Sequence, residues 1–305
     1  MIDEPLFIDT HIHGAFGEDV SDASADGIVK IARMLPSVGV RAFCPTTMTI
    51  PEDQILRVFD AVQEAKKRLE DEGGTYADIL GVHLEGPFMS PNKAGVQNKD
   101  CCISPSKAGP LVDRIGKEYP DLLKIIDVAP ELEGGIDFIR EYSGKYVISL
   151  AHTEADYDTA CEAFEAGAVS VTHILNAMNS CTKRDPGILG AVFDNKDIFC
   201  EVICDGIHIS PPVIRMLFNL IPEDRIIVIS DSMRGAGMPD GTYKLGDADV
   251  LVKGGRTYYG PAGNLAGSVT NMSEEAQRLI CFGIDPVKVR LACVENPLLR
   301  LNIML

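Results

Sequence analysis

The sequence predicts an α/β protein whose strands close into a (β/α)8 barrel. Eight short apolar runs, rich in β-branched residues, alternate along the 305 residues with segments of helical spacing. Strands that are apolar throughout are typical of a parallel sheet covered on both faces. Polar residues, above all histidines, recur at the carboxyl ends of these runs, where barrels of this kind build their functional sites. A doubly wound open sheet is the alternative arrangement.

The eight expected strands are 5–12, 40–47, 78–85, 122–130, 145–152, 168–174, 198–205 and 225–232. Two segments between them illustrate the helices. The stretch 51–69 places its apolar residues on one face, and Pro51 with the two acids after it suits a first helical turn. The stretch 156–167 is typical of a helix that ends at Gly167. We expect a helical tail from about Ser268 onwards.

The whole chain, 1–305, is expected to form a single barrel domain. One stretch departs from the strand–helix alternation. Residues 234–266, after the eighth strand, are rich in Gly and Asp and contain three short β-like runs. We interpret this stretch as a hairpin-like excursion from the barrel.

Composition and charge exclude several classes of partner. The formal net charge is −17, which repels nucleic acid phosphates and anionic membranes, so we expect neither as a partner. No apolar run reaches the ~18 residues that a membrane span requires. Nine scattered cysteines without a CxxC pair, and no leader before Pro5, favour a protein of the reducing cytoplasm over a disulfide-bonded one.

Histidines and acids gather at the ends of the expected strands. The residues concerned are His11, His13, His83, Glu85, His152, His173, His208 and Asp231, which include all six histidines of the chain. Because the carboxyl ends of barrel strands open onto one face, these side chains are expected to converge. Neutral imidazoles and carboxylates are suitable ligands for Zn²⁺ or Fe²⁺.

The spacing suggests how one or two divalent ions are held. Glu85, His152 and His173 form one candidate set of ligands. His11 and His13 form a second, because residues i and i+2 of a strand point to the same side, and Glu85 is available to both sets.

Two of the polar residues at the strand ends are interpreted differently. His83 is expected to be a hydrogen-bonded structural residue that lies deeper than Glu85. Asp231, beside a metal cluster, is expected to act as a general base.

Several longer blocks of the sequence carry a family resemblance. They are "HLEGPFMSPNKAG", "AHTEADYDTACEAFEAGAVSVTHILNAMN", "RDPGILGAVFDN", "DGIHISPPVIR", "SDSMRGAGMPDGTYKLG" and "LAGS". Over nearly its whole length the chain resembles the N-acetylglucosamine-6-phosphate deacetylases of the amidohydrolase superfamily. The resemblance implies a (β/α)8 TIM barrel of the metal-dependent amidohydrolase type.

The resemblance also implies roles for the polar strand ends. Glu85, His152 and His173 match the primary metal ligands of the family. His11 and His13 match a pair that holds a second ion in some members, whereas others work with one metal. Asp231 matches the catalytic aspartate.

A second group of residues matches the substrate-binding positions of the family. Asn176 and Ala177 match residues that contact the sugar phosphate, and Leu265 matches a residue of the substrate pocket. Arg184 resembles an arginine that reaches the phosphate from a neighbouring subunit, which implies a homodimer. The segment that contains Asp205, Gly206 and His208 resembles the part that faces the sugar.

The chain departs from the family pattern in two places. Gln97 stands where the family usually has a histidine that polarises the substrate carbonyl, and an amide can donate a hydrogen bond but carries no positive charge. The small β-sandwich that family members build from residues around the barrel is expected to be absent.

The implied activity is metal-dependent removal of the acetyl group from N-acetylglucosamine-6-phosphate, which gives glucosamine-6-phosphate and acetate. Water activated by the metal attacks the amide, and Asp231 serves as general base and then general acid. Two alternatives remain. One is a deacetylase of a different N-acyl amino sugar, such as N-acetylgalactosamine-6-phosphate. The other is a sugar-phosphate-binding protein without catalytic activity.

Overall fold

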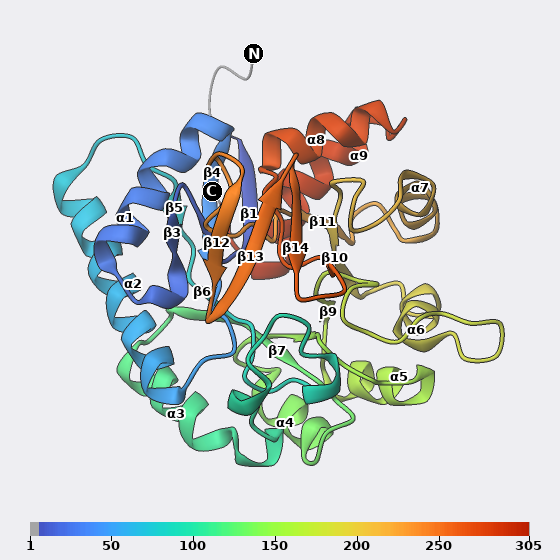
Figure 1. Cartoon of the computed structure of the whole chain (residues 1–305). Helices are drawn as coiled ribbons and strands as arrows, with labels where there is room; N and C mark the ends of the chain where they lie inside the picture. The colour runs from blue at the N-terminus through green and yellow to red at the C-terminus, as the bar shows by residue number, and fades with distance from the viewer. Residues whose placement is uncertain (1–5, 305) are drawn as a thin grey trace.

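The structure is a computed structural model that describes residues 6–304, so Pro5 of the first expected strand lies outside the described residues. Figure 1 shows strands at the centre of the molecule and helices arranged around them. Each of the eight expected strands contains observed strand residues. In chain order these are β1 (Phe7–Ile12), β4 (Val40–Pro45), β5 (Asp78–Ile79) with β6 (Val82–Leu84), β7 (Leu123–Val128), β8 (Val147–Leu150), β9 (Ser170–Val171), β10 (Phe199–Ile203) and β11 (Ile226–Ile229).

These strands form a closed parallel barrel. Hydrogen-bonded neighbours follow the orders β1-β4-β5 and β6-β7-β8-β9-β10-β11. Two parallel bridges join the two sheets, Thr46 with His83 and Ile12 with Ser232. The predicted (β/α)8 barrel is therefore confirmed, and the open-sheet alternative is wrong.

The third strand position is interrupted between β5 and β6. Gly81 has φ 143° there, and a Cβ atom on it would lie 2.4 Å from Cγ of Lys124 and 2.6 Å from the Leu122 carbonyl oxygen. Only glycine fits this backbone position, which lets β6 pair with β7 directly after the break. The register of β6 places Glu85 at the carboxyl end of the barrel.

The helices cover the outside of the barrel, and the longest corresponds to the helix expected over 51–69. The helices are α1 (Ala25–Met34), α2 (Glu52–Glu72), α3 (Gly109–Glu118), α4 (Gly135–Tyr142), α5 (Tyr157–Ala166), α6 (Gly187–Asp194), α7 (Pro211–Leu220), α8 (Met272–Cys281), α9 (Pro286–Arg290) and α10 (Asn296–Leu301). Helix α5 ends at Gly167, whose left-handed backbone (φ 117°) caps it as expected. No helix within residues 6–304 is long and apolar enough to cross a membrane.

The stretch 234–266 forms a small antiparallel sheet. Its strands are β12 (Gly241–Leu245), β13 (Ala248–Lys253) and β14 (Arg256–Tyr259), in the order β12-β13-β14. These strands make two consecutive hairpins, where the sequence suggested one hairpin-like excursion. In Figure 1 this sheet, in orange, lies in front of the barrel strands. A short hairpin, β2 (Gly14–Ala15) with β3 (Glu18–Asp19), follows the first barrel strand.

Candidate metal centre and substrate cavity

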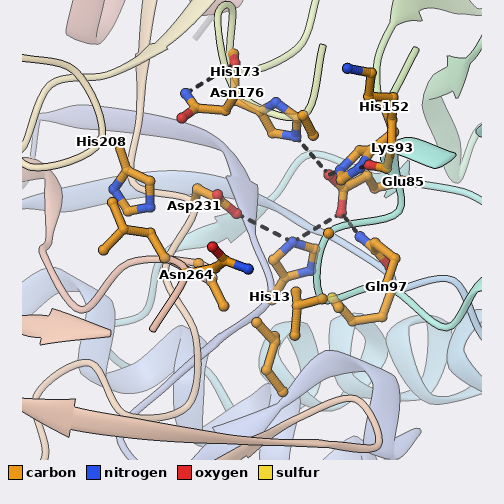
Figure 2. Close-up of a pocket in the computed structure, with 18 of the residues that line it drawn as sticks. His13, Glu85, Lys93, Gln97, His152, His173, Asn176, His208, Asp231 and Asn264 are labelled. Carbon is orange, nitrogen blue, oxygen red and sulfur yellow. Dashed lines mark hydrogen bonds and ion pairs between the residues drawn. The ribbon is translucent and has the colours of Figure 1, made fainter. Parts of the chain in front are cut away.

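Several polar residues at the strand ends have unusual backbone conformations. His152, His173 and Asp231 have φ of 44°, 30° and 47°, in the left-handed region that non-glycine residues rarely occupy. Such strain persists where the surrounding structure enforces it, and it is concentrated at functional sites. The strain turns these three side chains toward one place at the barrel mouth (Figure 2).

The carboxylate of Glu85 lies at the centre of the cluster. Its Oε1 is 3.1 Å from Nε2 of His152, 3.0 Å from Nε2 of His173 and 3.7 Å from Nε2 of His11. Its Oε2 is 3.1 Å from Nε2 of His13. All five side chains are buried. Four imidazole nitrogens from three parts of the chain therefore surround one carboxylate.

Asp231 completes the cluster on the side of the first strand. Its Oδ1 lies 3.4 Å from Nε2 of His11 and 3.3 Å from Nε2 of His13. Two sets of three side chains thus bring their ligand atoms within 4.8 Å of one another: Glu85, His152 and His173, and His11, His13 and Asp231.

The hydrogen bonds of the imidazoles show that a cation fits this cluster. Nδ1 of His152 lies 2.8 Å from the Lys93 carbonyl oxygen, and Nδ1 of His13 lies 3.3 Å from the Thr46 carbonyl oxygen. Because a carbonyl only accepts hydrogen bonds, both Nδ1 atoms carry a proton, so Nε2 is the ring atom that faces Glu85. In a neutral ring this Nε2 presents a lone pair to Glu85 oxygens, which are also acceptors. A cation between them, either a proton in the metal-free cluster or a metal ion, satisfies both acceptors.

The electrostatics of the metal-free cluster agree with this reading. Burial opposes ionisation of Glu85, but the neighbouring His11 and His13 hold the pKa of its carboxyl well below the usual value. Burial likewise favours a neutral His173, yet the contact with Glu85 raises its pKa to about 9. The pKa of His13 is also raised, mainly by Glu85, against the effect of burial. Protons therefore occupy the cluster when no metal is bound.

A cavity of about 590 Å³ opens above the cluster, which is within the size range of small-molecule sites. It is lined by five of the six clustered residues, His11 lying beneath the others. Of the expected substrate residues, Gln97, Asn176, Ala177, His208 and Leu265 also line it. Leu265 belongs to the segment after β14, so the excursion from the barrel forms one wall.

Gln97 faces the cluster rather than the open part of the cavity. Its side-chain amide donates a hydrogen bond to Oε2 of Glu85, and its Oε1 accepts one from the backbone N–H of Thr49 at 2.6 Å. Gln97 is buried. The side-chain amide thus links Glu85 to the backbone at Thr49 and holds the carboxylate in place.

His208 enters the cavity from the loop after β10. Asp205 orients it: Oδ2 of Asp205 lies 2.7 Å from Nδ1 of His208, and Oδ1 accepts the backbone N–H groups of Ile207 and His208 at 2.7 and 2.8 Å. Asp205 and Gly206 are not among the residues that line the cavity. They form the turn that presents His208.

Asn176 and Arg184 follow β9 on the same side of the barrel. The Asn176 side chain donates to the His173 carbonyl oxygen at 3.2 Å, and Ala177 beside it has φ 52°. Arg184 lies in an exposed loop and is not among the residues of its own chain that line the cavity.

Other polar residues at the site were missed by sequence reasoning. Lys93 lines the cavity from the end of a short 3-10 helix (Pro91–Lys93), and Asn264 lines it from the segment after β14; no periodic pattern of the sequence marks either residue. Glu201 lies beneath the cluster on β10 and is fully buried. The sequence does mark Glu201, because it is the one charged residue in an otherwise apolar strand. A buried charge needs a partner, so this position predicts a polar contact inside the barrel.

His83 lies deeper than Glu85, as the sequence suggested. Its Nδ1 faces the Thr10 carbonyl oxygen at 2.9 Å, and its Nε2 is 3.1 Å from Oδ1 of Asp127. Both ring nitrogens are thus turned to protein groups inside the barrel, which fits the structural role.

Comparison with known proteins identifies the family. No family model matches the chain. The N-acetylglucosamine-6-phosphate deacetylase of Bacillus subtilis (strain 168) is 37% identical over 276 residues, which cover 90% of this chain and 69% of that protein. The N-acetylgalactosamine-6-phosphate deacetylase of Escherichia coli O157:H7 is 33% identical over 288 residues, covering 93% and 74%.

Solved structures give the same result. A mutant N-acetyl-D-glucosamine-6-phosphate deacetylase from Mycobacterium smegmatis, in complex with N-acetyl-D-glucosamine-6-phosphate, superposes with a TM-score of 0.85 at 28% identity, covering 98% of this chain and 78% of that one. The enzyme from Pasteurella multocida superposes with a TM-score of 0.88 at 26% identity, covering 98% and 76%. The chain belongs to the N-acetylglucosamine-6-phosphate deacetylase family of amidohydrolases.

Proposed function

We propose that this protein hydrolyses the acetamide of N-acetylglucosamine-6-phosphate to glucosamine-6-phosphate and acetate, with the help of one or two divalent metal ions. One observation carries the proposal. Imidazoles from positions as distant in the chain as His13, His152 and His173 converge on Glu85 at the bottom of a cavity large enough for a sugar phosphate. The resemblance to deacetylases of known substrate supplies the reaction.

Two sets of residues would hold the ions. Glu85, His152 and His173 hold the first ion, and His11 with His13 hold a second next to Glu85. The donor set of imidazole and carboxylate favours Zn²⁺ or Fe²⁺. When bound, such an ion makes water ionise near neutral pH and polarises a carbonyl oxygen.

Asp231 is placed to move the proton. The neighbouring His13 and His11 hold the pKa of its carboxyl below the usual value although burial opposes this, so the free carboxylate is ready to accept a proton. It takes the proton of the attacking water and then delivers it to the nitrogen of the leaving amine. Its position at the rim of the cavity, within 3.4 Å of the two histidines, suits both steps.

The remaining cavity residues would bind the sugar phosphate. His208, oriented by Asp205, presents its other ring nitrogen to the substrate. Asn176 and Ala177 form the turn that receives the phosphate, and Leu265 packs against the sugar. Gln97 acts through Glu85, to which its side-chain amide donates a hydrogen bond.

Arg184 would reach the phosphate from a second copy of the chain, so the active form would be a homodimer. The exposure of Arg184 and its separation from the cavity of its own chain support this arrangement. We also place the protein in the cytoplasm, because its nine cysteines are free thiols.

A second candidate substrate is N-acetylgalactosamine-6-phosphate, which the similarity to the Escherichia coli relative favours. Acetate release from both sugar phosphates, and from the two unphosphorylated sugars, separates the candidates. We expect fastest turnover of N-acetylglucosamine-6-phosphate and little turnover without the phosphate. Faster turnover of the galactose epimer would assign the second substrate. Metal-replete protein that binds these phosphates without releasing acetate would favour the non-catalytic alternative.

A further inference from the structure

Below the metal cluster, Arg300 and Glu201 form an ion pair inside the barrel. Nη1 of Arg300, from α10, lies 2.7 Å from Oε1 of Glu201, and both side chains are fully buried. Arg300 also donates to Oγ of Ser170 at 3.0 Å and to Oγ1 of Thr10 at 2.7 Å. An arginine is thus placed among the barrel strands by the helix near the end of the described chain.

The other carboxylate oxygen of Glu201 contacts a proposed metal ligand. Oε2 of Glu201 lies 3.3 Å from Nδ1 of His11, while Nε2 of His11 lies 3.3 Å from Nε2 of His13. A carboxylate that accepts Nδ1–H fixes the imidazole tautomer and directs the Nε2 lone pair toward the ion. Glu201 therefore does for His11 what a backbone carbonyl oxygen does for the other two rings: it accepts the Nδ1 proton. For His152 this acceptor belongs to Lys93, and for His13 it belongs to Thr46.

His11, His83 and Glu201 bring ligand atoms within 4.8 Å of one another, but the contacts of Glu201 argue against a separate ion there. Arg300 already neutralises the carboxylate, and a cation among these residues would meet the guanidinium. Arg300 instead fixes the Glu201 side chain, because its Nη1 holds Oε1 while Oε2 stays directed at Nδ1 of His11.

We propose that Arg300 is a positioning residue which, through Glu201, orients His11 and so allows the protein to hold a second divalent ion beside His13. This inference rests on the proposed metal site but not on the identity of the substrate. Without Arg300, the buried carboxylate of Glu201 loses the partner that fixes its side chain. The contact that orients His11 toward the second ion is then no longer held in place.

Titration of the metal-free full chain with Zn²⁺, together with elemental analysis of the bound metal, tests the proposal. We expect the wild type to bind two ions. In Arg300→Met and Glu201→Gln the second ion is expected to bind about 10- to 100-fold more weakly, with the first unchanged. Arg300→Lys, which keeps the charge, recovers part of the loss. Ser149→Ala is the matched control, because it removes a buried hydroxyl that bonds Thr172 in the same barrel interior and leaves His11 untouched.

The double variant Arg300→Met with Glu201→Gln covers the case in which a single variant does not fold, since it leaves no unpaired buried charge. We expect it to melt at a higher temperature than either single variant and still to bind the second ion weakly. Wild-type affinity for both ions in Arg300→Met or in the double variant would overturn the inference, as would a wild type that binds one ion only. A wild type that binds two ions but releases no acetate contradicts the proposed activity and leaves this inference intact.

Discussion

Gln97 donates a hydrogen bond to Glu85, the carboxylate around which four imidazoles gather. The sequence placed Gln97 at a position where the family usually polarises the substrate carbonyl. In the structure its Oε1 also accepts the N–H of Thr49. The residue therefore holds the shared carboxylate between the two sets of proposed ligands.

Replacement of Gln97 with Met, which is similar in size, tests this role. We expect metal affinity to fall by roughly 10- to 100-fold, because a hydrogen bond to a proposed ligand is lost, whereas kcat at saturating metal changes much less. Metal titration and steady-state kinetics measure the two effects. The control is Gln54→Met, which removes a side-chain hydrogen bond to the Ser21 carbonyl oxygen away from the site. Unchanged metal affinity with a large loss of kcat would instead show that Gln97 acts on the substrate.

Asp231→Asn is expected to lower kcat by about 10²- to 10⁴-fold, the usual contribution of general acid–base catalysis. Metal binding through Glu85, His152 and His173 should persist. The fold should persist as well, because Asn tolerates the left-handed backbone at this position. Acetate release and elemental analysis measure these outcomes. Asp197→Asn, at an exposed carboxylate, is the control. Near-normal turnover in Asp231→Asn would remove Asp231 from the mechanism.

Metal affinity is expected to rise with pH between about 6.5 and 9. In the metal-free protein the pKa of His173 is raised to about 9, with burial opposing and the Glu85 contact outweighing it. The proton on His173 must leave before the nitrogen binds a metal, so each pH unit is worth up to about tenfold in affinity. Titrations with Zn²⁺ across this range measure the slope, and a flat profile would contradict the ligand role of His173.

The same raised pKa has a consequence for stability. A protonated His173 stabilises the metal-free fold fully below pH 6.5, the ordinary value, and this contribution is lost as pH rises through about 9. We therefore expect the melting temperature of chelator-treated protein to fall over this range more than that of metal-loaded protein. Calorimetry with and without metal tests the difference, and parallel curves would count against it.

Arg184→Ala is expected to raise KM for the phosphorylated substrate by roughly tenfold or more, since a charge-assisted contact is lost. Turnover of the unphosphorylated sugar should not change. Lys183→Ala, at the neighbouring exposed residue, is the control. If the arginine serves the partner subunit, mixing Arg184→Ala chains with Asp231→Asn chains restores fast turnover at the wild-type KM, a combination that neither variant shows alone. Mixed chains that keep the raised KM of Arg184→Ala would place Arg184 outside the partner's site.

The barrel and the proposed ligands were predictable because they follow from local rules. Strands covered on both faces are apolar throughout, and each such run ends at the barrel mouth. His152 and His173 could thus be paired without knowledge of the helices between them. The third strand is split at Gly81, but this does not change the position of Glu85. That position depends on the register of β6, which directly precedes Glu85.

The supporting contacts were not predictable from the same rules. Arg300 lies in a helix whose sequence shows nothing unusual, 99 positions after its partner, and no period in the chain links the two. Gln97 lies in a loop, where spacing does not fix the direction of a side chain. The turn that presents His208 depends on Asp205, whose contacts are with backbone N–H groups that sequence patterns do not reveal.

An anomalous-scattering map from crystals of the zinc-loaded protein locates the metal relative to the proposed ligands. We expect a strong peak within ~2.0–2.3 Å of ligand atoms from Glu85, His152 and His173. A second peak is expected next to His11 and His13. Peaks elsewhere in a metal-replete crystal, with Glu85, His152 and His173 free of metal, would show that these residues do not form the metal site.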